Sequence, residues 1–572
     1  MERNSHRKIT APIYELDDET IANIADYYSP GWNKTLINNQ SFDTMFQIEQ
    51  IPLSWFLQRL LTNHIIPPQL NTRQLLTRYN QKETINYDRN IDQKRKQLTR
   101  LYYYNELAKI HLTTKNNNFQ NNESQTLFLT YTDHKDIKTG EIYRINPIIK
   151  QLKKENETTS KKTLNPFILT CIPSGKPFTS IITKQKNYEN IHYSYCTTEI
   201  INRSKQQAKK IYELWESIPE EQKCLMIKSS ALWNCLRYAF DFYLSKEFIT
   251  IIFINYYLFQ QILQQQNIKV AIITSQNSIF ERCLNAAASK QNIPTILIQH
   301  GTGFGSINPS LLTPYHISVF SKYYKKKLIK KNIPTQNISI TGAIIFHGFC
   351  QEIKQEREKR KNQQNTKPKR ILIFTVPFIE QNFISDKEYI ESLTKIISDL
   401  LLLDIERITI KLHPRENTKK TIEKYTDIIE NKIIQEMKNR KNIEIKIIPH
   451  DKNNTISTLL SEHEIVINFS STTALEAAIF DKEIITVVYN TFRNPFNKIL
   501  EQSKATIIAT KDQNFSEIIT HFWNNHKKRQ KLHQNRITFV KKIAGDIDEK
   551  TPERITFLIH KQSMHQTKTK NQ

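Results

Sequence analysis

Short apolar runs alternate with helix-compatible segments through the second half of the chain. Helical spacing occurs in Lys387–Leu402 and Thr473–Phe480. The β-rich runs are RILIFTVP (370–377), ERITIKLHP (406–414), IEIKII (443–448), EIVINFSS (464–471) and EIITVVYN (483–490). Strands that alternate with helices are typical of a doubly wound parallel sheet, so we predict a Rossmann-like domain over residues 371–525.

An earlier part of the chain has a similar pattern. Gln125–Thr132 and Pro166–Ile172 are short apolar runs, and Lys269–Ser275 and PTILIQH (294–300) enclose a helical segment that contains Ala286–Ala288. Strand, helix and strand at this spacing predict parallel strands with a right-handed crossover. We therefore predict a first Rossmann-like domain over residues 125–350.

The remaining segments differ from both α/β patterns. Residues 1–118 have helical spacing in SWFLQRLLTNHI (54–65) and QLTRLYYYNELAKIHL (97–112), which predicts a helical N-terminal extension. Residues 351–370 carry eight basic and three acidic side chains and are predicted to be a linker or an exposed helix. Residues 526–572 are expected to form a basic C-terminal helix and tail. The predicted fold class is α/β, with two Rossmann-like domains that face a cleft.

Charge narrows the choice of partners. The 572 residues include 82 Lys and Arg against 56 Asp and Glu, a net charge of +26, which favours anionic partners such as nucleotides, phosphorylated acceptors, anionic lipid or nucleic acid. No zinc-finger, helix-turn-helix or RNP pattern is present, so nucleic acid is not favoured.

Cysteine spacing and hydropathy indicate in which cellular compartment the protein is expected and whether a metal site is expected. The six cysteines contain no CxxC pair and no His/Cys ligand spacing, which predicts a reducing compartment and no metal site. The N-terminus has no apolar signal-peptide core. The most apolar run, Phe248–Phe259, is interrupted by Thr250 and Asn255 and is interpreted as a buried core segment. We expect a cytoplasmic protein.

A glycine cluster marks the first candidate site. Five of the nine glycines lie between residues 301 and 348; His300 ends the predicted strand PTILIQH, and Gly301, Thr302 and Gly303 directly follow it. Glycines there predict positive φ or a close approach of the backbone to a ligand. His300, at the strand end facing the predicted cleft, is a candidate general base. A tight turn with a structural histidine would explain the same pattern.

Two further segments carry candidate donor-binding residues. Lys411, His413 and Arg415 close the predicted strand 406–414, where two cations and an imidazole suit a diphosphate or a sugar acid. In NFSSTTALEAA (468–478), Ser470, Ser471 and Thr472 are candidate helix caps at a phosphate site, and Glu476 is placed to accept hydrogen bonds from ribose hydroxyls. Simple capping of a structural helix is the alternative.

The order of these three motifs, HGT, KxHP and SSxxxxEA, resembles GT-B enzymes. The resemblance covers roughly residues 125–525 and includes CDP-glycerol glycerophosphotransferases of teichoic acid synthesis, bacterial polysialyltransferases and capsule Kdo transferases. It implies His300 as the base, His413 on donor phosphate, and Ser470, Ser471, Thr472 and Glu476 on the nucleotide. The chain departs from the teichoic acid pattern at Gly303–Phe304 and Asn468–Phe469, so the resemblance does not identify the donor.

The expected function is transfer of a sugar or polyol-phosphate from a nucleotide-activated donor to a carbohydrate or lipid-linked acceptor of the cell envelope or capsule. No metal and no cofactor are expected, since no DxD motif stands where a metal-dependent transferase needs one. The basic surface predicts peripheral association with the inner membrane face. Two alternatives remain: an isomerase like UDP-N-acetylglucosamine 2-epimerase, and a basic nucleic-acid- or membrane-surface-binding protein with a degenerate enzyme fold.

Overall fold

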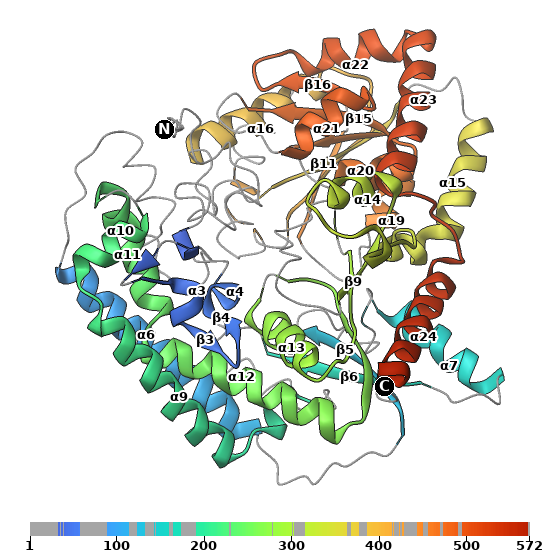
Figure 1. The fold of residues 1–572 in the computed structure, drawn as a ribbon. Helices are drawn as coiled ribbons and strands as arrows, with labels where there is room; N and C mark the ends of the chain where they lie inside the picture. Colours follow the sequence, from blue (N-terminus) through green and yellow to red (C-terminus); the bar gives the residue numbers. More distant parts are fainter. Residues whose placement is uncertain are drawn as a thin grey trace, which may run out of the picture. The chain divides into compact units, whose positions relative to one another are not determined.

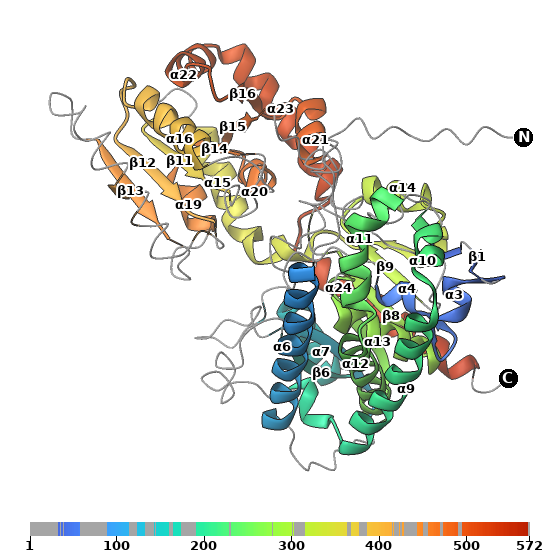
Figure 2. The same cartoon turned by 90° about the vertical axis from the view of Figure 1, so that its left-hand side faces the viewer.

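The computed structural model divides the chain into two compact units, which we describe one at a time (Figures 1 and 2). Unit 1 comprises residues 1–300, 304–345 and 549–572, and unit 2 comprises residues 301–303 and 346–548. The residues that the structure describes are 32–34, 36–37, 39–57, 89–113, 123–131, 142, 145–158, 164–172, 190–227, 230–276, 278–299, 301, 315–362, 368–376, 386–413, 416, 423, 426–427, 443–449, 456–469, 473–489 and 495–569.

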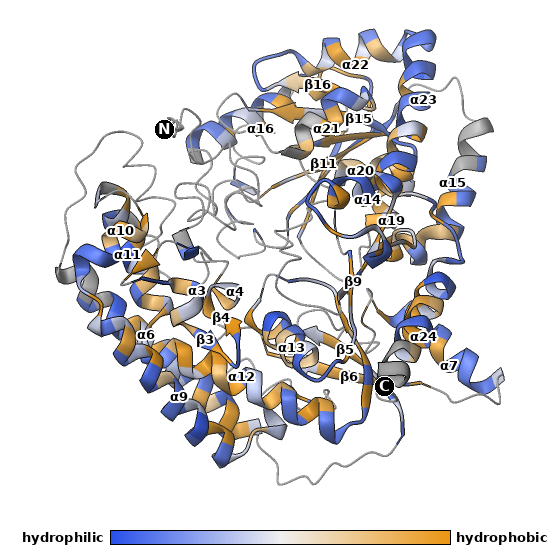
Figure 3. Ribbon diagram, in the orientation of Figure 1, coloured by the Kyte–Doolittle hydropathy of each residue, from blue (hydrophilic) through white to orange (hydrophobic). Residues whose placement is uncertain are grey.

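A six-stranded parallel sheet forms the centre of unit 1. Its hydrogen-bonded order is β10-β9-β8-β7-β5-β6, so the chain order reverses between β5 and β7. The strands are β5 (Gln125–Tyr131), β6 (Asn165–Cys171), β7 (Ile268–Ile273), β8 (Thr295–Ile298), β9 (Tyr315–Val319) and β10 (Ile338–Ile340). These strands are rich in apolar side chains, as expected because a parallel sheet is covered on both faces and its strands are buried. Figure 3 shows β5 and β6 in hydrophobic colours.

Long helices pack together in unit 1. Helix α12 carries the run Phe248–Phe259, which is buried throughout, as expected for a core segment, and it packs against α9, α13 and α6 (Figure 2). The helices of unit 1 are α6 (Arg89–Thr113), α7 (Asn146–Thr158), α9 (Thr198–Ser217), α10 (Glu220–Ile227), α11 (Ser230–Tyr243), α12 (Lys246–Gln265), α13 (Ile279–Lys290), α14 (Lys322–Ile329) and α24 (Thr551–Thr569), with the 3₁₀ turns η6 (His192–Tyr195) and η7 (Thr335–Asn337). No helix in the described part of the chain is long and apolar enough to cross a membrane.

The described N-terminal segment is only partly helical. Helix α6 covers the predicted helical run 97–112, whereas residues 32–57 form two antiparallel pairs that the sequence pattern did not predict. Their elements are η2 (Trp32–Lys34), β1 (Leu36–Ile37), β2 (Gln40–Ser41), α3 (Phe42–Met45), β3 (Gln47–Ile48), β4 (Ile51–Pro52) and α4 (Leu53–Phe56). At the second turn, Glu49 accepts hydrogen bonds from Tyr256 (2.9 Å) and Gln260 (3.1 Å) of α12. This segment is therefore tied to the helices of unit 1.

A second six-stranded parallel sheet forms unit 2. Its order is β13-β12-β11-β14-β15-β16, and the chain order reverses between β11 and β14. The strands are β11 (Arg370–Phe374), β12 (Arg407–Lys411), β13 (Glu444–Ile448), β14 (Ile465–Asn468), β15 (Glu483–Val488) and β16 (Ile507–Thr510). Numbered from one along the chain, this is the order 3-2-1-4-5-6 of dinucleotide-binding folds. The prediction of two doubly wound α/β units is confirmed.

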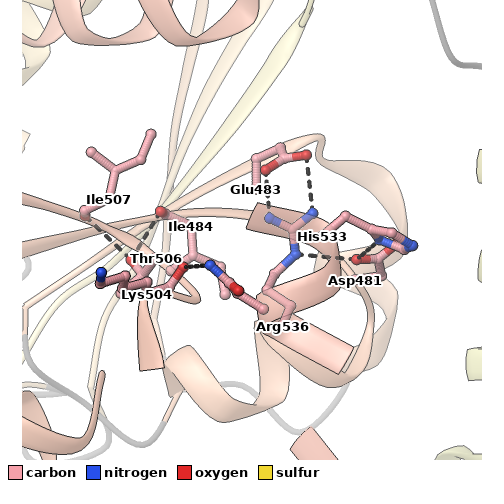
Figure 4. A network of polar contacts seen from close by, with 9 residues as sticks. Asp481, Glu483, Ile484, Lys504, Thr506, Ile507, His533 and Arg536 are labelled. Atoms are coloured by element: carbon pink, nitrogen blue, oxygen red, sulfur yellow. Dashed lines mark hydrogen bonds and ion pairs between the residues drawn. The ribbon is translucent and has the colours of Figure 1, made fainter. Parts of the chain in front are cut away.

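Buried ion pairs attach helices to the sheet of unit 2. Arg536 of α23 donates to both carboxylate oxygens of Glu483 (2.6 and 3.1 Å) and to Asp481 (3.1 Å), beside the start of β15 (Figure 4). Lys482 and Glu356 of α15 form a second buried pair at 2.5 Å. The helices are α15 (Cys350–Asn362), α16 (Asp386–Leu400), α19 (Ile456–Glu462), α20 (Thr473–Ile479), α21 (Pro495–Ser503), α22 (Phe515–Trp523) and α23 (His526–Ile543), and the 3₁₀ turn η8 (Ile344–Phe349) lies at the change from unit 1 to unit 2.

The basic C-terminal segment is shared by the two units. Helix α23 lies in unit 2, whereas α24 lies in unit 1 and packs against α7 and β7. The α24 side chains Thr556 and His560 both contact Glu155 of α7, at 2.7 and 3.1 Å. The chain therefore changes from unit 2 back to unit 1 within the segment that was predicted as one helix and tail.

Candidate functional site

Three segments with candidate residues leave the same edge of the sheet in unit 2. In the strand ladder, Phe374 of β11 lies opposite Lys411 of β12 on one side and Asn468 of β14 on the other. Because all strands are parallel, the residues after these positions emerge at the carboxyl edge, on both sides of the point where the chain order reverses. Ligands of open α/β sheets bind at this place. The sheet therefore brings Leu412 and His413, which follow β12, and Phe469, which follows β14, to one edge.

The side chain of Lys411 is directed along this edge. It is buried, and its Nζ donates to the carbonyl of Pro449, just after β13, at 2.6 Å. This bond joins the ends of β12 and β13. In the structure as described, the ammonium group thus has a structural contact.

The backbone of His413 is held by two neighbouring side chains. Its N–H donates to Thr375 Oγ1 and to Glu416 Oε2, both at 3.0 Å, and the Thr375 hydroxyl donates to the same Glu416 oxygen at 2.5 Å. Glu416 is fully buried and its own N–H donates to the carbonyl of His413 at 2.9 Å. His413 and Glu416 are therefore joined by hydrogen bonds in both directions, which close a turn between them, while the His413 residue itself remains half-buried.

Glu476 lies on α20, the helix that follows β14. The residue as a whole is half-buried, yet its carboxylate atom Oε2 is buried and has no hydrogen-bond partner among the described residues. Loss of hydration through burial raises the pKa of this carboxyl from 4.5 to about 7. A buried polar atom without a partner is costly, and functional sites are a frequent reason for retaining one.

Asn468 and Phe469, where the chain departs from the teichoic acid pattern, have structural contacts. The Asn468 amide donates to the Ile485 carbonyl (3.3 Å) and to Thr486 Oγ1 (3.1 Å) of β15. The Phe469 ring packs against Tyr389 and Tyr489, with centroids 5.6 and 6.3 Å away. Both side chains are buried and fix the end of β14.

Most of the glycine-rich segment lies outside the described residues. The candidate residues that lie outside the described part of the chain are His300, Thr302, Gly303, Arg415, Ser470, Ser471 and Thr472. Gln299, the residue before His300, is described: it continues the ladder of β8 by donating its N–H to Ser318, and its side chain accepts from Phe320 N at 3.0 Å. A Cβ on Gly301 would meet no atom of the described residues within 4 Å, so crowding by this part of the chain does not explain that glycine.

Sequence reasoning missed Thr375 and Glu416. The available signals were weak: a threonine directly after the run RILIF, and a glutamate three residues after His413. A spacing of three matches a closed turn, but it occurs often, and only the tertiary structure shows that both side chains meet at His413. Within the described part of the chain, no group of three or more His, Cys, Asp or Glu side chains is placed to hold a metal ion.

No protein-family model matches the chain, and a search of curated proteins finds no relative. Among solved structures, the chain is similar to the UDP-GlcNAc 2-epimerase of Neisseria meningitidis bound to UDP-GlcNAc, with 14% identity, TM-score 0.43, and coverage of 76% of this chain and 100% of that one. For MurG of Acinetobacter baumannii the values are 13%, 0.41, 76% and 99%. For the wall teichoic acid polymerase TagF with CDPG they are 12%, 0.38, 87% and 97%. Similarity this remote says nothing about the activity of this chain.

The raised pKa of Glu476 predicts a pH-dependent stability. Between about pH 4.5 and 7, the folded protein keeps a proton that the unfolded chain has lost, so its stability should fall as pH rises through this window and level off above it. Glu476→Gln cannot ionise and should lack this component. Urea titrations of both proteins at about pH 5, 6, 7 and 8 measure the effect. If the unfolding free energies of the wild type and Glu476→Gln differ by the same amount at every pH, the carboxyl of Glu476 is not desolvated.

Proposed function

We propose that the chain transfers a sugar or polyol-phosphate from a nucleotide-activated donor to a cell-surface carbohydrate acceptor, without a metal ion. The observation that carries the proposal is the buried Oε2 of Glu476, which has no partner in the described part and lies on the helix after β14, beside the reversal point of a 3-2-1-4-5-6 sheet. The hydroxyl groups of a ribose are donors that suit such a carboxylate.

His413 supports an anionic donor at the same edge. Its backbone is fixed by Thr375 and Glu416, and the imidazole of a half-buried residue in a fixed turn suits a phosphate group. Arg415, Ser470, Ser471 and Thr472 remain predicted donor-binding residues, as do Lys411 and the segment Gly301–Gly303. Unit 1 is then the proposed acceptor-binding unit, and the acceptor is a carbohydrate, free or linked to lipid.

Nucleotide binding at Glu476 is the first test. In a thermal-shift panel of CMP, CDP, UDP and GDP, at least one nucleotide should stabilise the wild-type protein by mass action. Glu476→Ala should weaken its binding by about 1.5–3 kcal/mol, because a charge-assisted hydrogen-bonded contact is lost. Affinity of the wild type should rise as pH increases through about 7, since the ribose hydroxyls favour the ionised carboxylate.

The matched control for this test is Glu464→Ala. Glu464 accepts hydrogen bonds from the N–H groups of Lys369 (3.1 Å) and Arg370 (2.7 Å) at the amino edge of the same sheet, so its loss should leave nucleotide affinity unchanged. If no nucleotide binds, or if Glu476→Ala binds as well as the wild type, the proposed donor site is wrong. Conversion of UDP-N-acetylglucosamine alone to its epimer would instead identify an isomerase.

His300 is the proposed general base, because in the sequence it directly follows Gln299, which continues β8 at the carboxyl edge of the sheet in unit 1. His300→Ala should lower turnover about 10²- to 10⁴-fold and leave donor affinity almost unchanged. The measurement is turnover, donor affinity and melting temperature on one purified sample. A destabilised variant that keeps near-normal turnover at low temperature would mean that the histidine is structural.

Helix α14 provides a surface for the proposed peripheral association with anionic membranes. Lys322, Lys326 and Lys327 of α14 and its C-terminal cap residue Lys330 are exposed, as are Ile329 and, on the neighbouring strand β10, Ile340, each 40% exposed. Each Lys near an anionic surface contributes about 1 kcal/mol, so four of them suffice for reversible binding.

Co-sedimentation with vesicles of phosphatidylglycerol and phosphatidylethanolamine tests this surface. Changing the four α14 lysines to Gln should abolish binding at low salt, whereas the same change at Lys527, Lys528, Lys531 and Lys541, exposed on α23, should not. Equal loss in both variants would point to net charge alone, and no binding of the wild type would exclude membrane association of this kind.

A further inference from the structure

We infer that Glu416 is a positioning residue for the donor phosphate, which it serves by holding the turn of His413 against the end of β11. The inference rests on the proposed function and deepens it. Glu416 itself is fully buried, so it is placed to act through the turn and not by contact with the donor.

The geometry of the turn carries the inference. Glu416 Oε2 accepts from the His413 N–H at 3.0 Å and from the Thr375 hydroxyl at 2.5 Å, and the Glu416 N–H closes the turn onto the His413 carbonyl at 2.9 Å. Thr375 follows β11 directly and His413 follows β12 after one residue. One carboxylate oxygen therefore fastens the ends of two neighbouring strands together, on one side of the reversal point, and limits the positions open to the His413 ring.

A role in stability alone would not require a carboxylate here. Burial of a charged group costs free energy unless hydrogen bonds compensate, and an apolar residue of similar size would fill the space at lower cost if the backbone donors had other partners. Here one carboxylate oxygen instead accepts from both the His413 N–H and the Thr375 hydroxyl, at the carboxyl edge of the sheet. In metal sites, loss of a group that hydrogen-bonds the ring of a ligating histidine weakens binding about 10- to 100-fold; Glu416 would orient His413 through its backbone N–H instead.

Two substitutions of Glu416 distinguish a role in positioning His413 from a direct effect of the negative charge. Glu416→Ala removes both hydrogen bonds and should weaken binding of the best nucleoside diphosphate, among CDP, UDP and GDP, about tenfold. Glu416→Gln keeps an oxygen that can accept from the same two donors, and should restore affinity to within about threefold of wild type. If the residue acted through its negative charge, both variants would lose repulsion toward phosphate and would bind more tightly.

A double-mutant cycle with His413→Ala tests whether Glu416 acts through that residue. If it does, Glu416→Ala should add less than about a twofold loss in the His413→Ala background. Should Glu416→Ala fail to fold, the pair Thr375→Val and Thr375→Ser provides the same comparison, because only serine keeps the hydroxyl that donates to Glu416 and accepts from His413 N. Glu464→Ala, at the opposite edge of the sheet, is the control for loss of a carboxylate that binds backbone N–H groups.

The outcomes are distinct. Weaker binding of Glu416→Ala, recovery in Glu416→Gln and non-additivity with His413→Ala support the inference. Unchanged or tighter binding of Glu416→Ala, an equal loss in both Glu416 variants, or full additivity with His413→Ala overturns it while the proposed function stands. If none of the three nucleoside diphosphates binds to the wild type, the proposed function fails and the inference fails with it.

Discussion

The parallel direction of the strands is the constraint from which the rest of unit 2 follows. In a sheet of six parallel strands, the carboxyl ends of all strands lie at the same edge. The reversal of chain order between β11 and β14 separates the helices that follow these two strands. Residues far apart in the sequence, such as Thr375, His413 and Glu476, are thereby brought to a single edge. A mixed sheet would distribute them over two edges.

Different hydrogen bonds and ion pairs maintain the two edges of this sheet. At the amino edge, buried charges are paired: Arg536 with Glu483 and Asp481, and Lys482 with Glu356. Loss of one partner in such a buried pair typically costs about 3–5 kcal/mol, because the remaining charge is left without compensation. These pairs attach α23 and α15 to the start of β15, so the amino edge has a structural role.

At the carboxyl edge, polar groups are arranged differently. Glu416 is compensated by hydrogen bonds to the turn it closes, whereas Oε2 of Glu476 is buried without a partner in the described part of the chain. The first arrangement fixes a backbone and the second leaves an acceptor available. In the proposed function, the fixed turn would serve the donor phosphate and the available acceptor would bind the ribose hydroxyl groups.

The amino-acid sequence by itself determined the α/β class and the two doubly wound units, because short apolar runs alternating with helical spacing leave few other solutions. It also identified His413 and Glu476 as candidates. It could not predict the antiparallel pairs of residues 32–57, whose two-residue strands lack a measurable period, nor the separation of α23 and α24 into different units. Only tertiary structure decided that Lys411 binds the Pro449 carbonyl, that Asn468 faces β15, and that Glu416 meets Thr375, because these contacts join residues that no local pattern relates.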